Sequence, residues 1–243
     1  MFTLLKKEIN SFFSSLTGYI VITVFLVVNS LFIWVFPGQN NVLDGGYATL
    51  DSLFTIAPWI FLFLVPAVTM RMFADEKHSG TIELLFTRPL SDFQIIFAKY
   101  LAALLLVLFS LLPTLIYFYS VYQLGNPVGN IDIGGTWGSY IGLFFLAAIY
   151  VSIGVLSSSF TDNQIVAFII GMLFSFIAYI GFDFMSELQI FESIKVFIIN
   201  LGINEHYKSM SRGVIDSRDV IYFVSVIAFF LLITKTILQS RKW

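Results

Sequence analysis

Six segments of this sequence are long and apolar enough to cross the hydrocarbon core of a membrane, which takes about 20 helical residues. None has a charged side chain in its middle, and Lys235 lies near the end of the last one, where its stem reaches the interface. Unbroken apolar runs of this length favour helices, because the strands of a membrane barrel are shorter and alternate in polarity. The approximate segments are 18–36, 53–70, 100–122, 136–157, 163–182 and 220–238. We therefore predict an all-α membrane protein with six transmembrane helices.

The composition agrees with this fold class and excludes several kinds of chemistry. Hydrophobic residues make up 58% of the 243 residues and charged residues 12%, against about 25% charged in soluble domains. The absence of cysteine excludes disulfides, thiol nucleophiles and cysteine-ligated metals. With a net charge of −2 and no basic stripe, the sequence indicates no nucleic-acid partner. Residues 9–43 carry no charge, so we expect the first apolar run to be a retained span and not a signal peptide.

The distribution of lysine and arginine predicts the orientation, because cytoplasmic loops carry an excess of these residues. With a cytoplasmic N-terminus, nine basic residues lie inside and four outside, and the loops near 37–52 and 123–135 have none. The inner nine are Lys6, Lys7, Arg71, Lys77, Arg88, Lys99, Lys235, Arg241 and Lys242, and the outer four are Lys195, Lys208, Arg212 and Arg218. Both termini are therefore expected on the cytoplasmic side.

A separate amphipathic pattern precedes the first span, in residues 1–17. Apolar side chains recur there at helical spacing, with lysines, serines and an asparagine between them. The apolar members are Phe2, Leu5, Ile9, Phe12 and Phe13, followed by Leu16. Such a stripe is typical of a helix that lies in the plane of the membrane surface. Two interpretations remain open, a membrane anchor alone or a helix that also contacts a cytoplasmic partner.

Charge is concentrated between the second and third spans, in the segment 71–99. Eight of the 28 charged residues of the chain (13 basic and 15 acidic) lie there. Residues 79–81, Ser-Gly-Thr, are suited to start a helix, and Glu83 falls in its first turn, where a carboxylate interacts favourably with the helix dipole. Pro89 disfavours the helical conformation in the residue before it. The pattern predicts a short helix over about 81–87.

This helix is too short to be stable alone in water, so something must hold it. Ile82, Leu85 and Phe86 make one apolar side. Ser91 and Gln94 fit a capping box that starts the helix leading into the third span. A solvated loop needs neither caps nor an apolar side, whereas a rigid surface that binds a cytoplasmic partner needs both. We therefore interpret the segment as a contact surface.

The segment 183–219, between the fifth and sixth spans, is neither clearly soluble nor clearly spanning. Its apolar side chains at positions 188, 191, 194 and 198 form one face. This pattern fits one or two short interfacial or re-entrant helices on the outer side of the membrane.

Small and polar residues inside the spans are interpreted mainly as packing features. Gly134, Gly138 and Gly142 form a G-x-x-x-G-x-x-x-G series that indicates close helix approach, unless Gly134 belongs to the preceding loop. The polar members are Thr23, Asn29, Ser110, Thr114 and Ser152, and Pro58, Pro66 and Pro113 are possible kinks. For the polar residues we favour helix packing over substrate contact.

Absent motifs exclude several activities. There is no G-x-x-x-x-G-K-[ST] phosphate loop, so the chain does not hydrolyse ATP itself. There is no H-E-x-x-H motif, and His78 and His206 fall on opposite sides in this topology, each expected to be solvated. Asp183, Glu187 and Glu192 match no metal-ligand spacing, so we expect no metal. No ionisable residue lies in the core of a span, which disfavours an ion-coupled carrier, and no catalytic pair indicates an intramembrane enzyme.

The stretch FADEKHSGTIELLFTRPLSDFQIIFAKY, at 73–100, resembles the cytoplasmic loop of ABC-2 type transporter permeases. The family pattern there is an acidic–basic pair, then G-T-x-E-x-L, then a proline, then a lysine at the start of the third helix. The matching residues are Glu76, Lys77, Gly80, Thr81, Glu83, Leu84, Pro89 and Lys99. The N-terminal LLKKEINSFFSSLTGYI and the ending RKW also resemble the family, so the resemblance covers the chain as one transmembrane domain, 1–243.

The resemblance implies a coupling helix at 79–87 that is seated in a groove of a separate ABC ATPase subunit, with Leu85 among the contacting residues. ATP and Mg would be used by that subunit, and this chain would bind no cofactor itself. A second permease copy or a paralogue would complete the membrane core. The stretch SRGVIDSRDVIYF, at 211–223, resembles the permease subunit of gliding-motility-associated ABC transporters of Bacteroidota and related export systems. It implies the bacterial inner membrane and a partner with a large periplasmic domain.

Two functions follow from the resemblance. The first is a non-catalytic permease subunit that couples ATP hydrolysis in its partner to export. The alternative is a mechanical transmitter that moves no substrate and passes the work of ATP hydrolysis to a periplasmic partner. For the first, lipid, polysaccharide and peptide substrates all remain open.

Overall fold

The computed structural model describes residues 1–87, 89–213 and 215–240. Arg88 and Val214, and the ending 241–243 with two of the inner basic residues, lie outside the described residues, and so does the side chain of Phe86. Every regular element in the described part is helical, which confirms the all-α class.

Among the described residues, six helical stretches are long and apolar enough to span a membrane, as expected. They are α2 (Leu16–Ser30) with η1 (Leu31–Val35); α4 (Asp51–Thr69) with α5 (Arg71–His78); α7 (Asp92–Leu111) with η2 (Leu112–Thr114) and α8 (Leu115–Leu124); α9 (Ile133–Phe160); α10 (Gln164–Phe176) with η3 (Ile177–Gly181) and α11 (Phe182–Glu187); and α14 (Ser217–Ser240). The second and third spanning helices are longer than the predicted apolar segments 53–70 and 100–122. Additional turns that carry charged residues continue both helices at the termini end.

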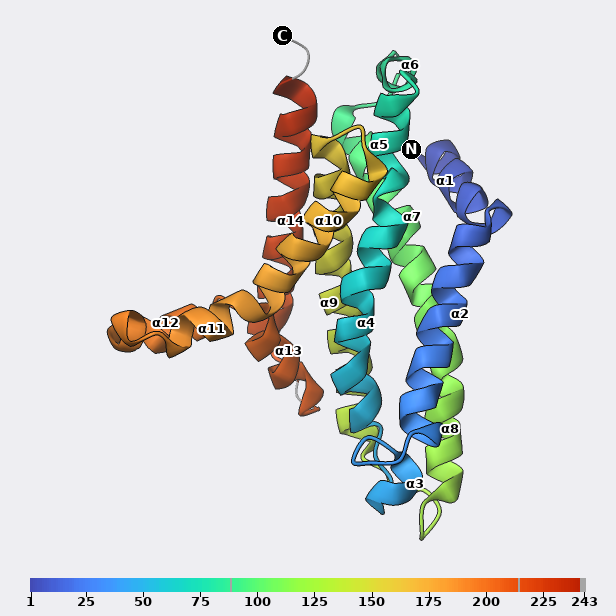
Figure 1. The fold of residues 1–243 in the computed structure, drawn as a ribbon, viewed down its shortest axis with the longest axis vertical. Coiled ribbons are helices and arrows are strands. Elements are labelled where there is room, and N and C mark those ends of the chain that lie inside the picture. Colours follow the sequence, from blue (N-terminus) through green and yellow to red (C-terminus); the bar gives the residue numbers. More distant parts are fainter. Residues whose placement is uncertain (88, 214, 241–243) are drawn as a thin grey trace.

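Short helices occupy the two ends of the bundle and one side (Figure 1). They are α1 (Phe2–Ser14), α3 (Val42–Gly45), α6 (Ile82–Phe86), η4 (Gln189–Ile194), α12 (Lys195–Ile199) and α13 (Ile203–Ser211). In Figure 1, α1, α5, α6 and the last turns of α14 lie at one end, which we call the termini end. The opposite end, with α3 and the connection from α8 to α9, is called the far end.

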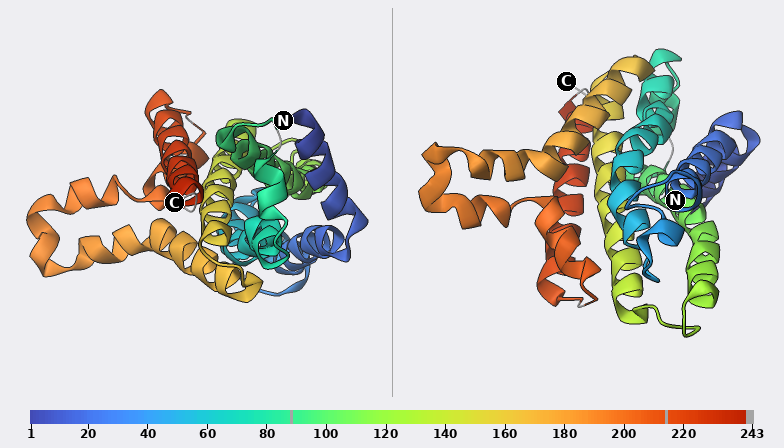
Figure 2. Two further views of the ribbon diagram at one scale, coloured as in Figure 1. Left: turned by 90° about the horizontal axis from the view of Figure 1, so that it is seen from above. Right: turned by 60° about the horizontal axis from the view of Figure 1, so that its bottom comes forward.

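Helix α9 forms the centre of the bundle, with α4, α7, α10, α13 and α14 packed around it (Figure 2). Tyr150 in its middle is fully buried. Two glycines let neighbouring helices come close. At Gly138, a Cβ would lie only 2.6 Å from the backbone oxygen of Met210 on α13, and at Gly142 it would lie 3.2 Å from the Met210 Cβ. The glycine series therefore marks the contact of α9 with α13, and Gly134 contributes little because its Cβ would meet only the Asp132 side chain at 3.5 Å.

The polar side chains inside the spans bond to their own helices. Asn29, Ser110, Thr114 and Ser152 are buried, and each donates a hydrogen bond to a carbonyl three or four residues earlier. These bonds agree with the packing interpretation for all four, whereas Thr23 is exposed on α2.

A proline in α4 leaves a backbone carbonyl free to accept a hydrogen bond from another helix. Pro58 has no N–H, so the carbonyl of Phe54 lacks its usual partner four residues on. The hydroxyl of Tyr207 on α13 donates to this carbonyl at 2.7 Å. Burial raises the pKa of Tyr207 well above its ordinary value, so the hydroxyl keeps its proton. Pro66 also lies inside α4, and Pro113 lies where α7 changes into the short turn η2.

We expect Tyr207→Phe to lower the free energy of unfolding by about 1–3 kcal/mol, because the buried Phe54 carbonyl would lose its hydrogen-bond donor. Unfolding in mixed micelles measures the loss. Tyr222→Phe is the matched control: its hydroxyl also donates to a backbone carbonyl, that of Leu201, but this bond is exposed. If the two variants lost the same stability, the bond at Pro58 would have no special role.

The chain leaves the bundle sideways after the fifth span (Figures 1 and 2). The π-helical turn η3 follows α10, and α11, η4 and α12 then form an arm that projects beyond α14. Several large apolar side chains of the arm are exposed, namely Phe184, Leu188, Ile190, Val196 and Phe197. The arm thus presents an apolar surface that the chain itself does not cover.

His206 was expected to be solvated, but its side chain contacts other helices. Its Nδ1 lies 2.7 Å from Asp219 Oδ1, and its Nε2 lies 2.9 Å from the backbone oxygen of Asn200. Its ring stacks on Tyr222 with centroids 3.8 Å apart. The prediction for His206 was wrong because these partners come from α14 and from the end of α12, which the local sequence does not show. His78 is exposed, as expected.

Candidate coupling site at the termini end

The turn between α5 and α6 depends on Gly80, which has a φ of +69°. A side chain would find open space there, so the backbone conformation and not crowding calls for glycine. Ser79 and Thr81 do not start α6 as expected. The Ser79 hydroxyl donates to the Asp75 carbonyl at 2.7 Å and pairs with the Thr81 hydroxyl at 2.8 Å, so both serve the end of α5. Helix α6 begins without a side-chain cap and ends at Phe86, before Pro89.

The apolar side of α6 faces the chain itself. Leu85 is 6% exposed and lies at a cavity with Leu4 of α1, while Ile82 packs against the hydrophobic core. Glu83 and Leu84 point the other way, and Leu84 is 66% exposed. The surface open to a partner at α6 is therefore carried by Glu83 and Leu84, and Leu85 holds the helix in place.

The eight residues predicted to contact the ATPase fall into two groups in the structure. The exposed ones are Gly80, Thr81, Glu83, Leu84 and Pro89, which we call the exposed tip. The others are Glu76, Lys77 and Leu85, which are at least partly buried and contact other parts of the chain. Lys77 donates to the backbone oxygen of Ser159 at the end of α9.

A buried cluster of charges lies between α1, α5 and α7. Lys99 of α7 is 1% exposed, and its ammonium group lies 2.9 Å from Glu76 Oε1 on α5 and 3.2 Å from Glu8 Oε1 on α1. It also donates to the Met72 carbonyl at 2.7 Å and lies 5.2 Å from the centre of the Phe73 ring. We call Glu8, Glu76 and Lys99 the ion cluster. It joins three elements that are far apart in the sequence.

Helix α1 is therefore fastened to the bundle as well as amphipathic. Leu4 and Glu8 are its buried residues, and the helix packs against α7 and α2. The apolar stripe predicted for the membrane surface is divided. Its outermost residue Phe2 is 76% exposed, whereas Leu5, Ile9, Phe12 and Phe13 are half-buried.

Sequence reasoning missed Glu8. It lies four residues after Leu4 and four before Phe12, so it shares the apolar face of α1. A carboxylate on an apolar face needs a buried cation, and that requirement was the available signal. Its partner Lys99 lies 91 residues away, and the helical pattern alone does not identify it.

Within residues 1–87, 89–213 and 215–240 no group of three or more potential ligands is placed to hold a metal ion. The site consists of an exposed tip on a short helix whose apolar side packs on the chain, and of an ion cluster that joins α1, α5 and α7.

Comparison with known proteins identifies the family. The family model described as ABC-2 family transporter protein matches residues 5–234. The chain belongs to the ABC-2 transporter family. Members of this family are the membrane subunits of ABC transporters, and ATPase activity belongs to partner proteins.

One curated relative is the uncharacterized protein YhcI of Bacillus subtilis (strain 168). It is 35% identical over 124 residues, which are 50% of this permease and 36% of the relative. The matched part is thus just over a third of the relative's own length. That protein is itself uncharacterized, so the likeness adds no activity.

Proposed function

We propose that this permease couples ATP hydrolysis by a separate ABC ATPase subunit to export across the bacterial inner membrane, and that the segment 71–99 makes the coupling contact. The exposed tip is the observation that carries the proposal. Leu84 is a large apolar side chain on a helix too short to be stable alone, and it lies beside Glu83. An apolar anchor with a charge at its edge is typical of a protein contact surface.

The ion cluster gives the coupling contact a route into the spans. Glu76 lies on α5, which continues α4 in the second span, and Lys99 lies in the first turns of the third span. Movement of the tip would therefore displace the second and third spans as well as α1. Closure of two ATPase subunits around ATP and Mg would supply that movement, with no cofactor bound by this chain.

Orientation and assembly are part of the same proposal. The described basic residues of the inner set all belong to elements at the termini end, which favours a cytoplasmic termini end. Residues 1–243 would form one transmembrane domain, with 1–17 as the interfacial helix, 71–99 as the coupling segment and 183–219 on the periplasmic side. A second permease copy or a paralogue would complete the core, and a gliding-motility or secretion system with a large periplasmic subunit is the proposed setting.

The arm favours one alternative function. Its exposed apolar residues, among them Ile190 at 85%, form a surface suited to a further protein on the periplasmic side. In that case the permease would be a mechanical transmitter without a substrate. Export of a defined molecule by a reconstituted complex would decide against this alternative.

The proposal predicts that Leu84→Asp and Glu83→Lys will each abolish co-purification of the ATPase or uncouple its activity, because they alter the exposed tip without removing a buried contact. Pull-down of the tagged permease in mild detergent, with identification of the bound proteins, is the measurement. Leu43→Asp is the matched control, since Leu43 is similarly exposed at 63% but lies on α3 at the far end. Normal ATPase binding and coupling in both tip variants would disprove the coupling role.

A further inference from the structure

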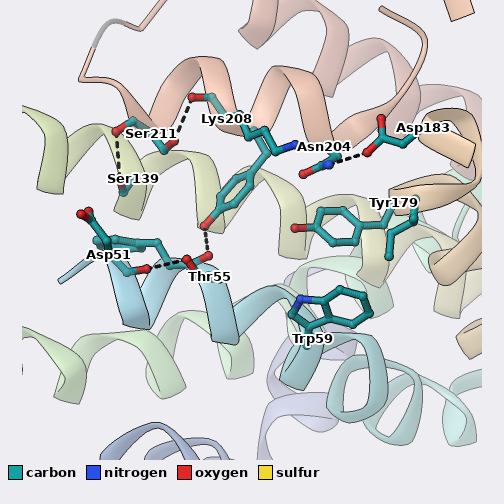
Figure 3. Close-up of a pocket in the computed structure, with 12 residues that line it drawn as sticks. Asp51, Thr55, Trp59, Ser139, Tyr179, Asp183, Asn204, Lys208 and Ser211 are labelled. Atoms are coloured by element: carbon teal, nitrogen blue, oxygen red, sulfur yellow. Dashed lines mark hydrogen bonds between the residues drawn. The ribbon is translucent and has the colours of Figure 1, made fainter. Parts of the chain in front are cut away.

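A pocket of about 470 Å³ lies at the far end of the spans, away from the coupling site (Figure 3). Residues of α4, α9, η3 and α13 line it, together with Asp183 at the start of α11. Its volume is within the range of pockets that hold small ligands. The proposed coupling mechanism does not use it.

One wall of the pocket is aromatic. Trp59 of α4 and Tyr179 of η3 meet edge to face, with ring centroids 6.0 Å apart. In Figure 3 the two rings lie next to each other, below the hydrogen-bonded pair of Asp183 and Asn204. Aromatic faces attract cations, most strongly where water is partly excluded.

The charged side chains of the lining are mainly acidic. The lining contains two carboxylates, those of Asp51 and Asp183, and one ammonium group, that of Lys208. Four lining hydroxyls already donate to backbone carbonyls and so offer a ligand only their lone pairs. They belong to Thr55, Ser139, Tyr207 and Ser211. A ligand that fits this lining carries hydrogen-bond donors and positive charge.

The exposed face of α4 changes in polarity along the pocket. Asp51, Thr55, Trp59 and Phe63 follow one another at four-residue spacing and are all exposed. The first two are polar and lie toward the far end, where the span leaves the apolar region. The last two are large and apolar and lie toward the middle of the span. This gradient matches an amphiphile with its head at the far end and its tail inside the membrane.

We propose that the pocket binds an amphiphile whose head carries a positively charged ammonium group. The head lies between the aromatic wall and the carboxylates, and the apolar chain follows Trp59 and Phe63. That such a molecule is the exported cargo rests on the proposed function, whereas binding itself requires no ATPase.

Tryptophan fluorescence tests the proposal. A variant that keeps Trp59 and replaces Trp34, Trp137 and Trp243 with phenylalanine is titrated in neutral maltoside micelles with hexylammonium, hexyl sulfate and hexyl glucoside. Only the ammonium probe should produce a saturable change. The matched control keeps Trp137 instead, which lines a separate apolar pocket between α7, α8 and α9, and it should not respond. Equal responses to the three heads, or at both tryptophans, would show simple partitioning and overturn the proposal.

Charge variants test which groups recognise the head. Asp51→Asn and Asp183→Asn should each weaken binding of the ammonium probe about threefold to tenfold, and Lys208→Met should strengthen it by a similar factor. Thermal stabilisation of the chain with its native tryptophans by the three probes provides a second measurement, should the single-tryptophan variants fold poorly. Absence of ammonium-selective stabilisation there would also overturn the proposal. This failure would leave ATPase co-purification intact, and a failed co-purification would leave binding intact, so the two proposals are tested separately.

Discussion

Lys99→Met is expected to lower the free energy of unfolding by about 3–5 kcal/mol, because it leaves two buried carboxylates without their cation. The side chains of Glu8 and Glu76 are only 11% and 15% exposed, so water does little to compensate. Unfolding of the purified permease in mixed micelles measures the loss. Release of α1 should accompany it, detectable as faster tryptic cleavage at Lys6 and Lys7.

Two further variants separate the buried charge from other causes. Lys7 also lies near the ion cluster, 3.5 Å from Glu8 Oε1, but its side chain is 63% exposed. Lys7→Met should therefore cost little. Adding Glu8→Gln and Glu76→Gln to Lys99→Met should recover much of the stability, because no buried charge then remains. If Lys7→Met and Lys99→Met cost the same, the ion cluster would not hold the three elements together.

Gly138→Ala should displace α13 from α9 and cost about 1–3 kcal/mol, the usual range for an overpacked contact. The new methyl group would meet the backbone of Met210 and Gly213, and neither can move without moving the helix. Tryptic cleavage at Lys208 and Arg212 should accelerate. The affinity of the amphiphile pocket for the ammonium probe should fall, because α13 supplies one wall of the pocket.

Gly134→Ala is the matched control on the same helix. Its methyl group would find only an ordinary contact with the Asp132 side chain, so the change should be neutral or slightly stabilising. Equal effects at the two glycines would mean that helix propensity, and not close packing, governs the region.

Much of the architecture was predictable because a membrane constrains sequence so strongly. Uncharged runs of helical length identify six spans, and Ser91 with Gln94 forms the expected capping box at the start of α7. Local chemistry also predicted that α6 would end before Pro89. These features depend on residues that are close together in the chain.

The parts that the sequence did not reveal depend on distant partners. The pattern in α6 shows that Leu85 lies on an apolar side, but not that α1 covers this side. The same holds for Glu8 and for His206, whose partners belong to other helices. Helical periodicity predicts which residues share a face, whereas the residues that pack against that face are known only from the structure.

The sequence also did not predict the amphiphile pocket, since Asp51, Trp59 and Tyr179 belong to no recognisable motif. For Asp183 the sequence offers only a metal-ligand role, and the spacing of the neighbouring carboxylates does not favour it. The pocket arises because η3 and α13 bring residues from three separate parts of the chain around α4. Their common role is visible only in three dimensions.

Helices α4 and α5 follow each other through a turn at Met70 and together form the second span. Asp51 is its first residue and lines the amphiphile pocket, while Glu76 lies near its last turn and belongs to the ion cluster. At 1.5 Å per residue the second span is roughly 40 Å long, so a tilt of about 5° moves one of its ends by roughly 3–4 Å relative to the other. A small rocking step at the termini end would therefore change the shape of a binding pocket at the far end without any local rearrangement between them.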